Sequence, residues 1–119
     1  MVQPILLVDD ETPVRRLIKT VLLRHGFQVI EAEDGVSALS TLTQLKGDLS
    51  LVVSDVVMPW LDGIGLCQQV KKIFPHIPVL LISGNQPNAC RVGDRFLEKP
   101  FHPDTFISTV RDLVTAHAS

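Results

Sequence analysis

The sequence has few cysteines, and the two that it has, Cys67 and Cys90, form no recognisable pattern. Zinc sites and disulfide frameworks need several cysteines or histidines at short, regular spacings, which this chain lacks. We therefore expect both thiols to be reduced, as thiols are in a reducing compartment. The pattern excludes cysteine-ligated metal proteins and disulfide-stabilised secreted domains.

The chain also lacks a long apolar run and an excess of basic residues. No stretch approaches the ~18 apolar residues that a membrane-spanning helix needs, and the N-terminus lacks the basic region of a signal peptide. The 11 basic and 13 acidic residues give a formal net charge of −2, so no basic surface for nucleic acid is expected. We predict a cytoplasmic protein that binds neither membrane nor nucleic acid.

The composition that remains is that of a folded domain. The chain has 119 residues, and 45% of them are hydrophobic, which is enough for a core. Its length is typical of one domain, and no internal repeat or low-complexity segment interrupts it. We expect a single domain over residues 1–119.

Five apolar runs are too short for helices and are rich in valine, isoleucine and leucine. They span residues 5–8, 27–30, 49–53, 79–82 and 96–97. Runs of this kind, apolar on both faces, are typical of parallel strands that are buried between two layers.

Four other segments show the apolar spacing of amphipathic helices. Thr12 is the expected cap of the first, and Gly26 ends it. Asp34 and Asp62 are expected to cap the next two, and Pro103 opens the last. Each of these residues favours a helix boundary at its position.

Strands that alternate with helices predict an α/β fold with a parallel sheet covered on both faces. Five strands favour a flavodoxin-like (βα)5 three-layer sandwich with the strand order 2-1-3-4-5. In such sheets, ligands bind at the carboxyl ends of the strands, so functional residues are expected there.

Polar side chains follow the predicted strands at those ends. Asp9 and Asp10 follow the first strand, and Asp55 follows the third. Ser83 lies at the end of the fourth strand, and Lys99 lies at the end of the fifth. The predicted fold brings these residues to one edge of the sheet.

Taken singly, each residue has an ordinary interpretation as a charged loop, a turn or a solvated lysine. Together they form an acidic pocket, in which two carboxylates ~4 Å apart repel by roughly 4 kcal/mol at an effective dielectric constant of 20. Either one carboxyl is protonated or a cation binds. An oxygen-only site with few protein ligands suits Mg²⁺, which prefers to keep several waters.

Four segments of the sequence resemble a known family. They are ILLVDDE (5–11), SDVVMPWLDG (54–63), LLISG (80–84) and FLEKPF (96–101). In this combination they are similar to the receiver domains of response regulators in two-component signal transduction. The similarity runs through nearly the whole chain.

The resemblance implies a phosphoacceptor. Asp55 would take a phosphoryl group from the phosphohistidine of a sensor histidine kinase or a phosphotransfer protein, in a reaction that depends on Mg²⁺. Asp10 and Asp55 would bind the Mg²⁺ directly, Asp9 mainly through water, and Val57 through its backbone carbonyl. The domain would catalyse only its own phosphorylation and dephosphorylation, so it is not expected to be an enzyme.

The resemblance also implies a conformational switch. Ser83 would hydrogen-bond the phosphoryl oxygens, and Lys99 would pair with another of them. The Lys99–Pro100 peptide bond would be cis, a form that proline makes accessible. Phe96 matches the aromatic residue whose rotation accompanies activation in this family.

The chain departs from the family between Ser83 and Lys99. This segment is shorter than usual by roughly one and a half helical turns, which predicts a shortened or irregular fourth helix and puts the usual output surface in doubt. Val57 and Asn85 stand at positions that influence phosphoryl hydrolysis, and an apolar Val57 predicts slow loss of the group. Trp60 is expected to be a partly exposed packing residue.

Two other functions are weighed against the phosphoacceptor. A degenerate receiver would bind a protein partner without phosphorylation, which the shortened segment favours. A Mg²⁺-dependent phosphohydrolase of small molecules would need an acid where Val57 stands, which argues against it. The sequence names neither the downstream target nor the oligomeric state, and it does not separate a stand-alone regulator from a receiver excised from a hybrid kinase.

Overall fold

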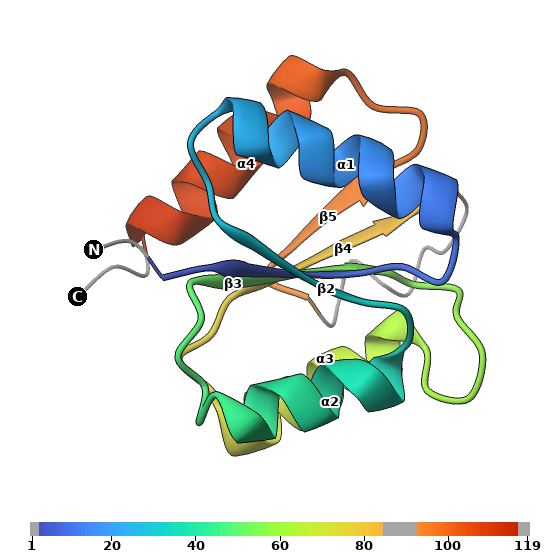
Figure 1. Cartoon of the computed structure of the whole chain (residues 1–119), viewed down its shortest axis with the longest axis vertical. Helices are drawn as coiled ribbons and strands as arrows, with labels where there is room; N and C mark the ends of the chain where they lie inside the picture. The colour runs from blue at the N-terminus through green and yellow to red at the C-terminus, as the bar shows by residue number, and fades with distance from the viewer. Residues whose placement is uncertain (1–2, 85–92, 117–119) are drawn as a thin grey trace.

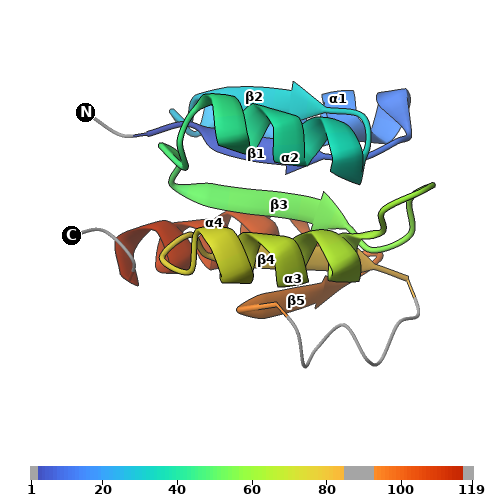
Figure 2. The same cartoon turned by 90° about the horizontal axis from the view of Figure 1, so that it is seen from below.

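The computed structural model describes residues 3–84 and 93–116. Figure 1 shows a sheet with helices on both of its faces. The strands are parallel and form one sheet in the order β2-β1-β3-β4-β5, which confirms the predicted flavodoxin-like order (Figure 2). In chain order the described elements are β1 (Ile5–Val8), α1 (Thr12–Arg24), β2 (Val29–Ala32), α2 (Gly35–Gln44), β3 (Leu51–Asp55), α3 (Gly63–Ile73), β4 (Val79–Ser83), β5 (Arg95–Glu98) and α4 (Pro103–Ala116).

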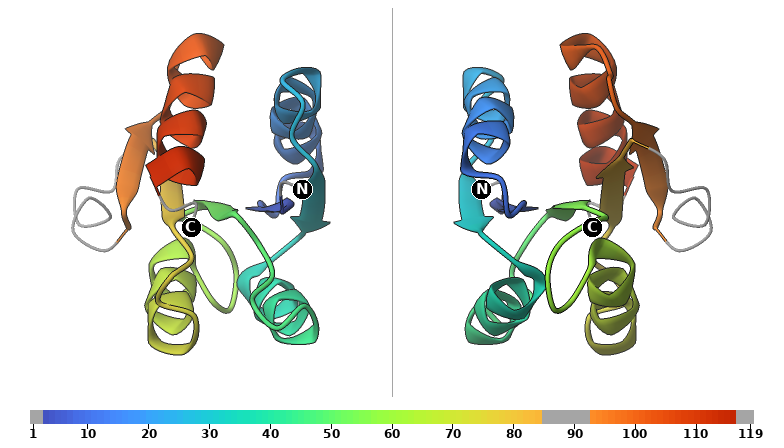
Figure 3. Two further views of the ribbon diagram at one scale, coloured as in Figure 1. Left: turned by 90° about the vertical axis from the view of Figure 1, so that its left-hand side faces the viewer. Right: turned by 90° about the vertical axis from the view of Figure 1, so that its right-hand side faces the viewer.

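The helices cover both faces of the sheet. Helices α1 and α4 lie on one face, and α2 and α3 lie on the other (Figure 3). Each face has its own core: Ile5 and Leu7 of β1 join the first, and Leu6 and Val8 join the second. Strands β1, β3 and β4 are buried along their whole length, as expected for strands between two layers of helices.

Two of the three predicted side-chain caps are present. The carboxylates of Asp34 and Asp62 each accept the N–H of the residue three positions on, at 2.7 Å in both helices. The prediction for Thr12 is wrong, because α1 already begins there and its N-cap residue, Glu11, makes no side-chain cap. The carboxylate of Asp9 accepts the N–H of Glu11 at 2.9 Å, so the chain turns into the helix one residue early.

Strands β2 and β3 begin two residues later than predicted. Leu49 is buried in the core, but its N–H donates to the carbonyl of Gly47 at 2.9 Å, within a turn. The N–H of Phe27 likewise donates to Leu22 at the end of α1, at 3.2 Å. Leu49 is buried and Phe27 is partly buried without pairing in the sheet. The apolar pattern of the sequence detects burial and not strand pairing.

The shortened fourth helix expected between Ser83 and Lys99 falls on residues 85–92, which lie outside the described residues. The helix labelled α4 is the last one of the chain. Within residues 3–84 and 93–116, no helix has the length and apolar character to cross a membrane.

All five strands point toward the same edge of the sheet (Figure 2). The loops that follow β1, β3, β4 and β5 therefore start from this edge. The polar side chains that the sequence placed at strand ends belong to these loops and to the last residues of the strands.

Candidate functional site

Four acidic side chains meet at the carboxyl ends of β1 and β3. Asp9, Asp10, Glu11 and Asp55 each have a carboxylate oxygen within 4.8 Å of those of the other three. Asp9 and Asp55 are buried, with 2% and 8% of their surface exposed, whereas Asp10 and Glu11 are exposed. A compact set of carboxylate oxygens, open to solvent on one side, fits a hard divalent cation such as Mg²⁺.

Lys99 and Ser83 lie at the same edge. The Nζ of Lys99 is 3.8 Å from Oδ2 of Asp55, and the backbone N–H of Lys99 donates to the carbonyl of Ser83 at 2.9 Å. Ser83 is buried and follows Ile82, which pairs with Asp55 in the sheet. The Lys99–Pro100 peptide bond is cis, which confirms that expectation.

The loop after Asp55 returns closely to the strand that it leaves. The N–H of Gly63 donates to the carbonyl of Val56 at 2.8 Å. A Cβ at Gly63 would stand 2.2 Å from the carbonyl oxygen of Asp55 and 2.8 Å from the Cα of Val56. Only glycine allows this approach without a shift of the backbone, so Gly63 helps to hold the end of β3 in place.

The buried acids of the cluster are hard to ionise. Burial raises the pKa of Asp55, and the nearby Asp10 carboxylate raises it further, while Lys99 and two backbone N–H groups oppose the shift. Burial also raises the pKa of Asp9, against the hydrogen bond from the Glu11 N–H. A bound cation would relieve the electrostatic cost that both shifts express.

Replacing Asp9 by asparagine should stabilise the protein when divalent metal is absent. The pKa of Asp9 is raised on folding, so protonation of this carboxyl favours the folded state. The contribution of Asp9 to the free energy of unfolding is therefore fully present below its ordinary pKa of 3.8 and is lost as the pH rises through the raised pKa. At neutral pH in EDTA, Asp9→Asn should melt about 2–6 °C above the wild type, while an Asn side chain still accepts the Glu11 N–H.

The gain from Asp9→Asn should shrink as the pH is lowered toward the ordinary value, where the wild-type carboxyl is protonated too. A matched control is Asp112→Asn, which removes the same charge from an exposed position on α4. Melting curves at neutral and acidic pH compare the two variants, and a lower melting temperature for Asp9→Asn at neutral pH would contradict the prediction.

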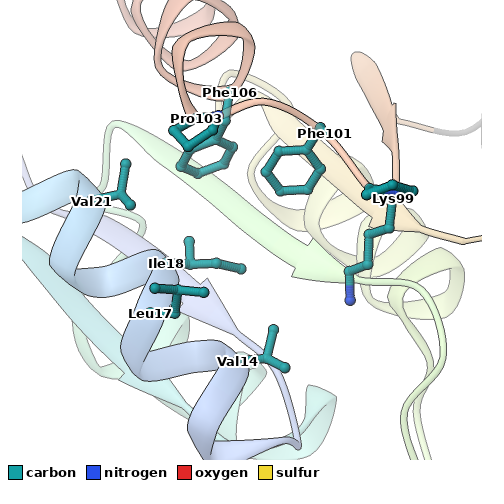
Figure 4. A pocket seen from close by; sticks show the side chains of 9 residues that line it. Val14, Leu17, Ile18, Val21, Lys99, Phe101, Pro103 and Phe106 are labelled. Carbon is teal, nitrogen blue, oxygen red and sulfur yellow. The ribbon is translucent and has the colours of Figure 1, made fainter.

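An apolar groove of about 530 Å³ opens beside Lys99, between α1 and the segment that leads into α4. Figure 4 shows the Phe101 and Phe106 rings on one wall and side chains of α1 on the other, with Lys99 at one end. The two rings stack with their centroids 5.5 Å apart. Leu17 of α1 is 67% exposed, so an apolar surface adjoins the charged site. The residues that line it are Val14, Leu17, Ile18, Val21, Lys99, Pro100, Phe101, Pro103 and Phe106.

Trp60 points outward, and the expectation that it packs against the protein is wrong. Its side chain is 85% exposed. Its backbone φ is +66°, in the left-handed region that residues other than glycine rarely adopt. Met58, which is 8% exposed, is the buried apolar residue of this loop and joins the core under α2 and α3. The side chain of Val57 is 60% exposed.

The resemblance also singled out Phe96 and Asn85. Phe96 is half-buried on β5, where it pairs with Leu81 and packs on the core of the α2 and α3 face. Asn85 belongs to residues 85–92, which the structure does not describe.

Sequence reasoning missed Arg15, which contacts the backbone of the cluster. Its Nη1 donates to the carbonyl oxygen of Asp9 at 2.6 Å, and its Nε donates to Glu31 of β2 at 3.1 Å. The apolar stripe of α1 gives no signal for it, because Arg15 lies beside the stripe and Glu31 is 16 positions away. An arginine near the start of a helix is ordinarily a solvated residue.

Comparison with known proteins identifies the family. Residues 5–111 match the response regulator receiver domain, and the chain belongs to this family. The expected resemblance is thereby confirmed.

Two similar proteins show the contexts in which related domains occur. The chain is 39% identical over 116 residues to a "Probable transcriptional regulator ycf27" of Cyanophora paradoxa, covering 92% of the chain and 47% of that protein. It is 37% identical over 118 residues to the "Sensor kinase CckA" of Brucella abortus (strain 2308), covering 92% of the chain and 12% of that protein. The chain thus spans about half of the length of the first relative and a much smaller share of the second.

One similar solved structure is a complex with bound ligands. The response regulator protein TrrA of Thermotoga maritima, in complex with Mg(2+)-BeF, superposes on this chain with a TM-score of 0.85 and 27% identity. The match covers 93% of this chain and 98% of that one.

Proposed function

We propose that this domain is a phosphoacceptor in a two-component phosphorelay, with Asp55 as the residue that is phosphorylated. The observation that carries the proposal is the meeting of four carboxylates within 4.8 Å of one another, with Lys99 3.8 Å from Asp55. A nucleophilic carboxylate, a positive side chain and a set of cation ligands are the groups that phosphoryl transfer to an aspartate requires.

The proposed Mg²⁺ ligands are carboxylate oxygens of Asp10 and Asp55 and the backbone carbonyl of Val57, with Asp9 acting mainly through water. When bound, Mg²⁺ supplies positive charge that offsets the charge of the phosphoryl oxygens. Support comes from the oxygen-only donor set and from the Mg(2+)-BeF complex of the similar TrrA protein. The raised pKa values of Asp9 and Asp55 are consistent with a site that holds a cation in its working state.

In the proposed step, an ionised oxygen of Asp55 attacks the phosphorus of the donor's phosphohistidine. A P–O bond forms, the P–N bond breaks, and its electron pair stays on the histidine nitrogen. Lys99 stabilises charge on the phosphoryl oxygens, and Ser83 donates a hydrogen bond to another of them. The domain thereby promotes only its own phosphorylation and the later loss of the group, which the apolar Val57 makes slow.

The phosphorylated state differs from the free one by a large local charge. A phosphoryl group adds about −1.5 to −2 charges and strong acceptor oxygens, and Ser83 is the residue proposed to move toward them. Phe96 is proposed to change rotamer with Ser83, because β5 pairs with β4 and both residues belong to those strands. A local charge event would then reach the exposed surface of β5.

The proposed donor is a sensor histidine kinase or a phosphotransfer protein in the cytoplasm. One similar protein is named a sensor kinase and another a transcriptional regulator, so the phosphoryl group would come from a protein rather than from a metabolite. The apolar groove beside Lys99 supports a protein donor, because it extends the surface next to Asp55 that such a donor would cover.

Incubation with acetyl phosphate tests the proposal without a known kinase. In Mg²⁺, intact-protein mass spectrometry should show the addition of one phosphoryl group, and in EDTA it should show none. A protein whose mass does not change in Mg²⁺ would instead be a degenerate receiver that binds its partner without phosphorylation.

A further inference from the structure

Arg15 holds the backbone that carries the acidic cluster. It is the fourth residue of α1, and its Nη1 donates to the carbonyl oxygen of Asp9 at 2.6 Å. That oxygen belongs to the peptide group that joins Asp9 to Asp10. A hydrogen bond from a charged donor is among the stronger ones, so the guanidinium fixes the orientation of the peptide from which the Asp10 side chain projects.

Arg15 is itself held in place from the neighbouring strand. Its Nε donates to Oε1 of Glu31 at 3.1 Å, and the other oxygen of Glu31 accepts from Lys19 at 3.0 Å. Glu31 lies on β2, opposite Leu7 of β1. The Arg15 side chain is only 13% exposed, and its planar fork of donors reaches Glu31 and Asp9 in fixed directions.

The direction of Asp10 depends on this backbone. Asp10 is exposed at the rim of the cluster, where repulsion from the other three carboxylates favours its turning away. Mg²⁺ demands near-octahedral geometry, so a misdirected ligand weakens binding. Mutation of groups that hydrogen-bond to metal ligands and orient them typically weakens metal affinity by about 10–100-fold.

We propose that Arg15 is a positioning residue for the divalent-cation site, which acts by holding the Asp9 carbonyl so that Asp10 stays directed at the cation. The inference rests on the proposed function, since it takes Asp10 as a ligand. Charge alone predicts the opposite effect, because a nearby guanidinium repels Mg²⁺. The sign of the change on removing Arg15 therefore separates positioning from electrostatics.

The test measures Mg²⁺ affinity by titration of backbone amide NMR shifts, which also reports whether each variant is folded. Arg15→Met should raise the Kd for Mg²⁺ by about tenfold. Lys19→Met is the matched control, because it removes the same charge from the same Glu31 pair without touching Asp9. It should change the Kd by less than about twofold, since half-exposed ion pairs contribute little.

Phosphorylation by acetyl phosphate gives an independent measurement. For Arg15→Met, the Mg²⁺ concentration at half-maximal rate should rise with the Kd, while the rate at saturating Mg²⁺ stays near that of the wild type. A merely structural role would lower the melting temperature and leave the Kd unchanged. If Arg15→Met does not fold, Arg15→Lys, which keeps the charge but lacks the planar fork, should raise the Kd in the same direction.

The outcomes separate the two proposals. An unchanged or lower Kd in the Arg15 variants, with normal binding by the wild type, would overturn the role of Arg15 alone. A wild type that shows no Mg²⁺ binding would overturn the proposed metal site and the role of Arg15 with it.

Discussion

Asp55→Asn should abolish phosphorylation of this protein by acetyl phosphate. An amide oxygen is a far weaker nucleophile than a carboxylate, and the transfer proposed here has no other acceptor. Intact mass should therefore show complete labelling of the wild type in Mg²⁺ and no labelled species in the variant. Peptide mapping of the wild type should find the added group on the peptide that contains Asp55.

A control variant in the same loop makes this result specific. Asp62 is an exposed aspartate that caps α3 by accepting the N–H of Gly65 at 2.7 Å. Asparagine at this position keeps the cap, so Asp62→Asn should be labelled like the wild type. Labelling that persists in Asp55→Asn would move the acceptor to another acid of the cluster, and Asp9 and Asp10 are then the residues to replace.

The fold was predictable because its signals are local and redundant. Short apolar runs indicate strands, apolar stripes indicate helices, and residues such as Asp34 and Gly26 mark helix ends. The alternation of strands with helices then restricts the sheet to very few topologies. The errors, at the starts of β2 and β3 and at Thr12, arose where side chains are buried without pairing or where Asp9 rather than Thr12 organises the turn.

The candidate site was predictable only in part. Asp9 and Asp10 follow β1, Asp55 ends β3, and Lys99 follows β5, so the topology alone brings these residues to one edge of the sheet. The role of Arg15 was not predictable, because its two partners come from β1 and β2 and no spacing along the chain records them. The outward direction of Trp60 depends on a left-handed backbone, for which tryptophan gives no signal.

Gly63→Ala should destabilise the protein by about 3 kcal/mol, the upper range for overpacking a tight site. The added Cβ would meet the carbonyl oxygen of Asp55 at 2.2 Å and the Cα of Val56 at 2.8 Å. Both atoms belong to the backbone at the end of a buried strand, so neither can move without shifting β3. Urea unfolding measures the loss, which is a large part of the 5–15 kcal/mol typical of a domain.

Gly65→Ala is the matched control, because it adds the same methyl group to the same turn of α3. There the closest atom would be the Cδ1 of Leu61, at 2.8 Å, which is the far end of a flexible side chain. Alanine also favours the helix by up to ~1 kcal/mol over glycine, so the stability of Gly65→Ala should stay within about 1 kcal/mol of the wild type. Equal losses of stability in the two variants would mean that the first turn of α3 tolerates no side chain at either position. The close approach of Gly63 to Asp55 would then not be the specific cause. A selective loss of stability in Gly63→Ala, accompanied by slower phosphorylation, would show that the close return of the loop holds Asp55, the proposed phosphoacceptor, in place.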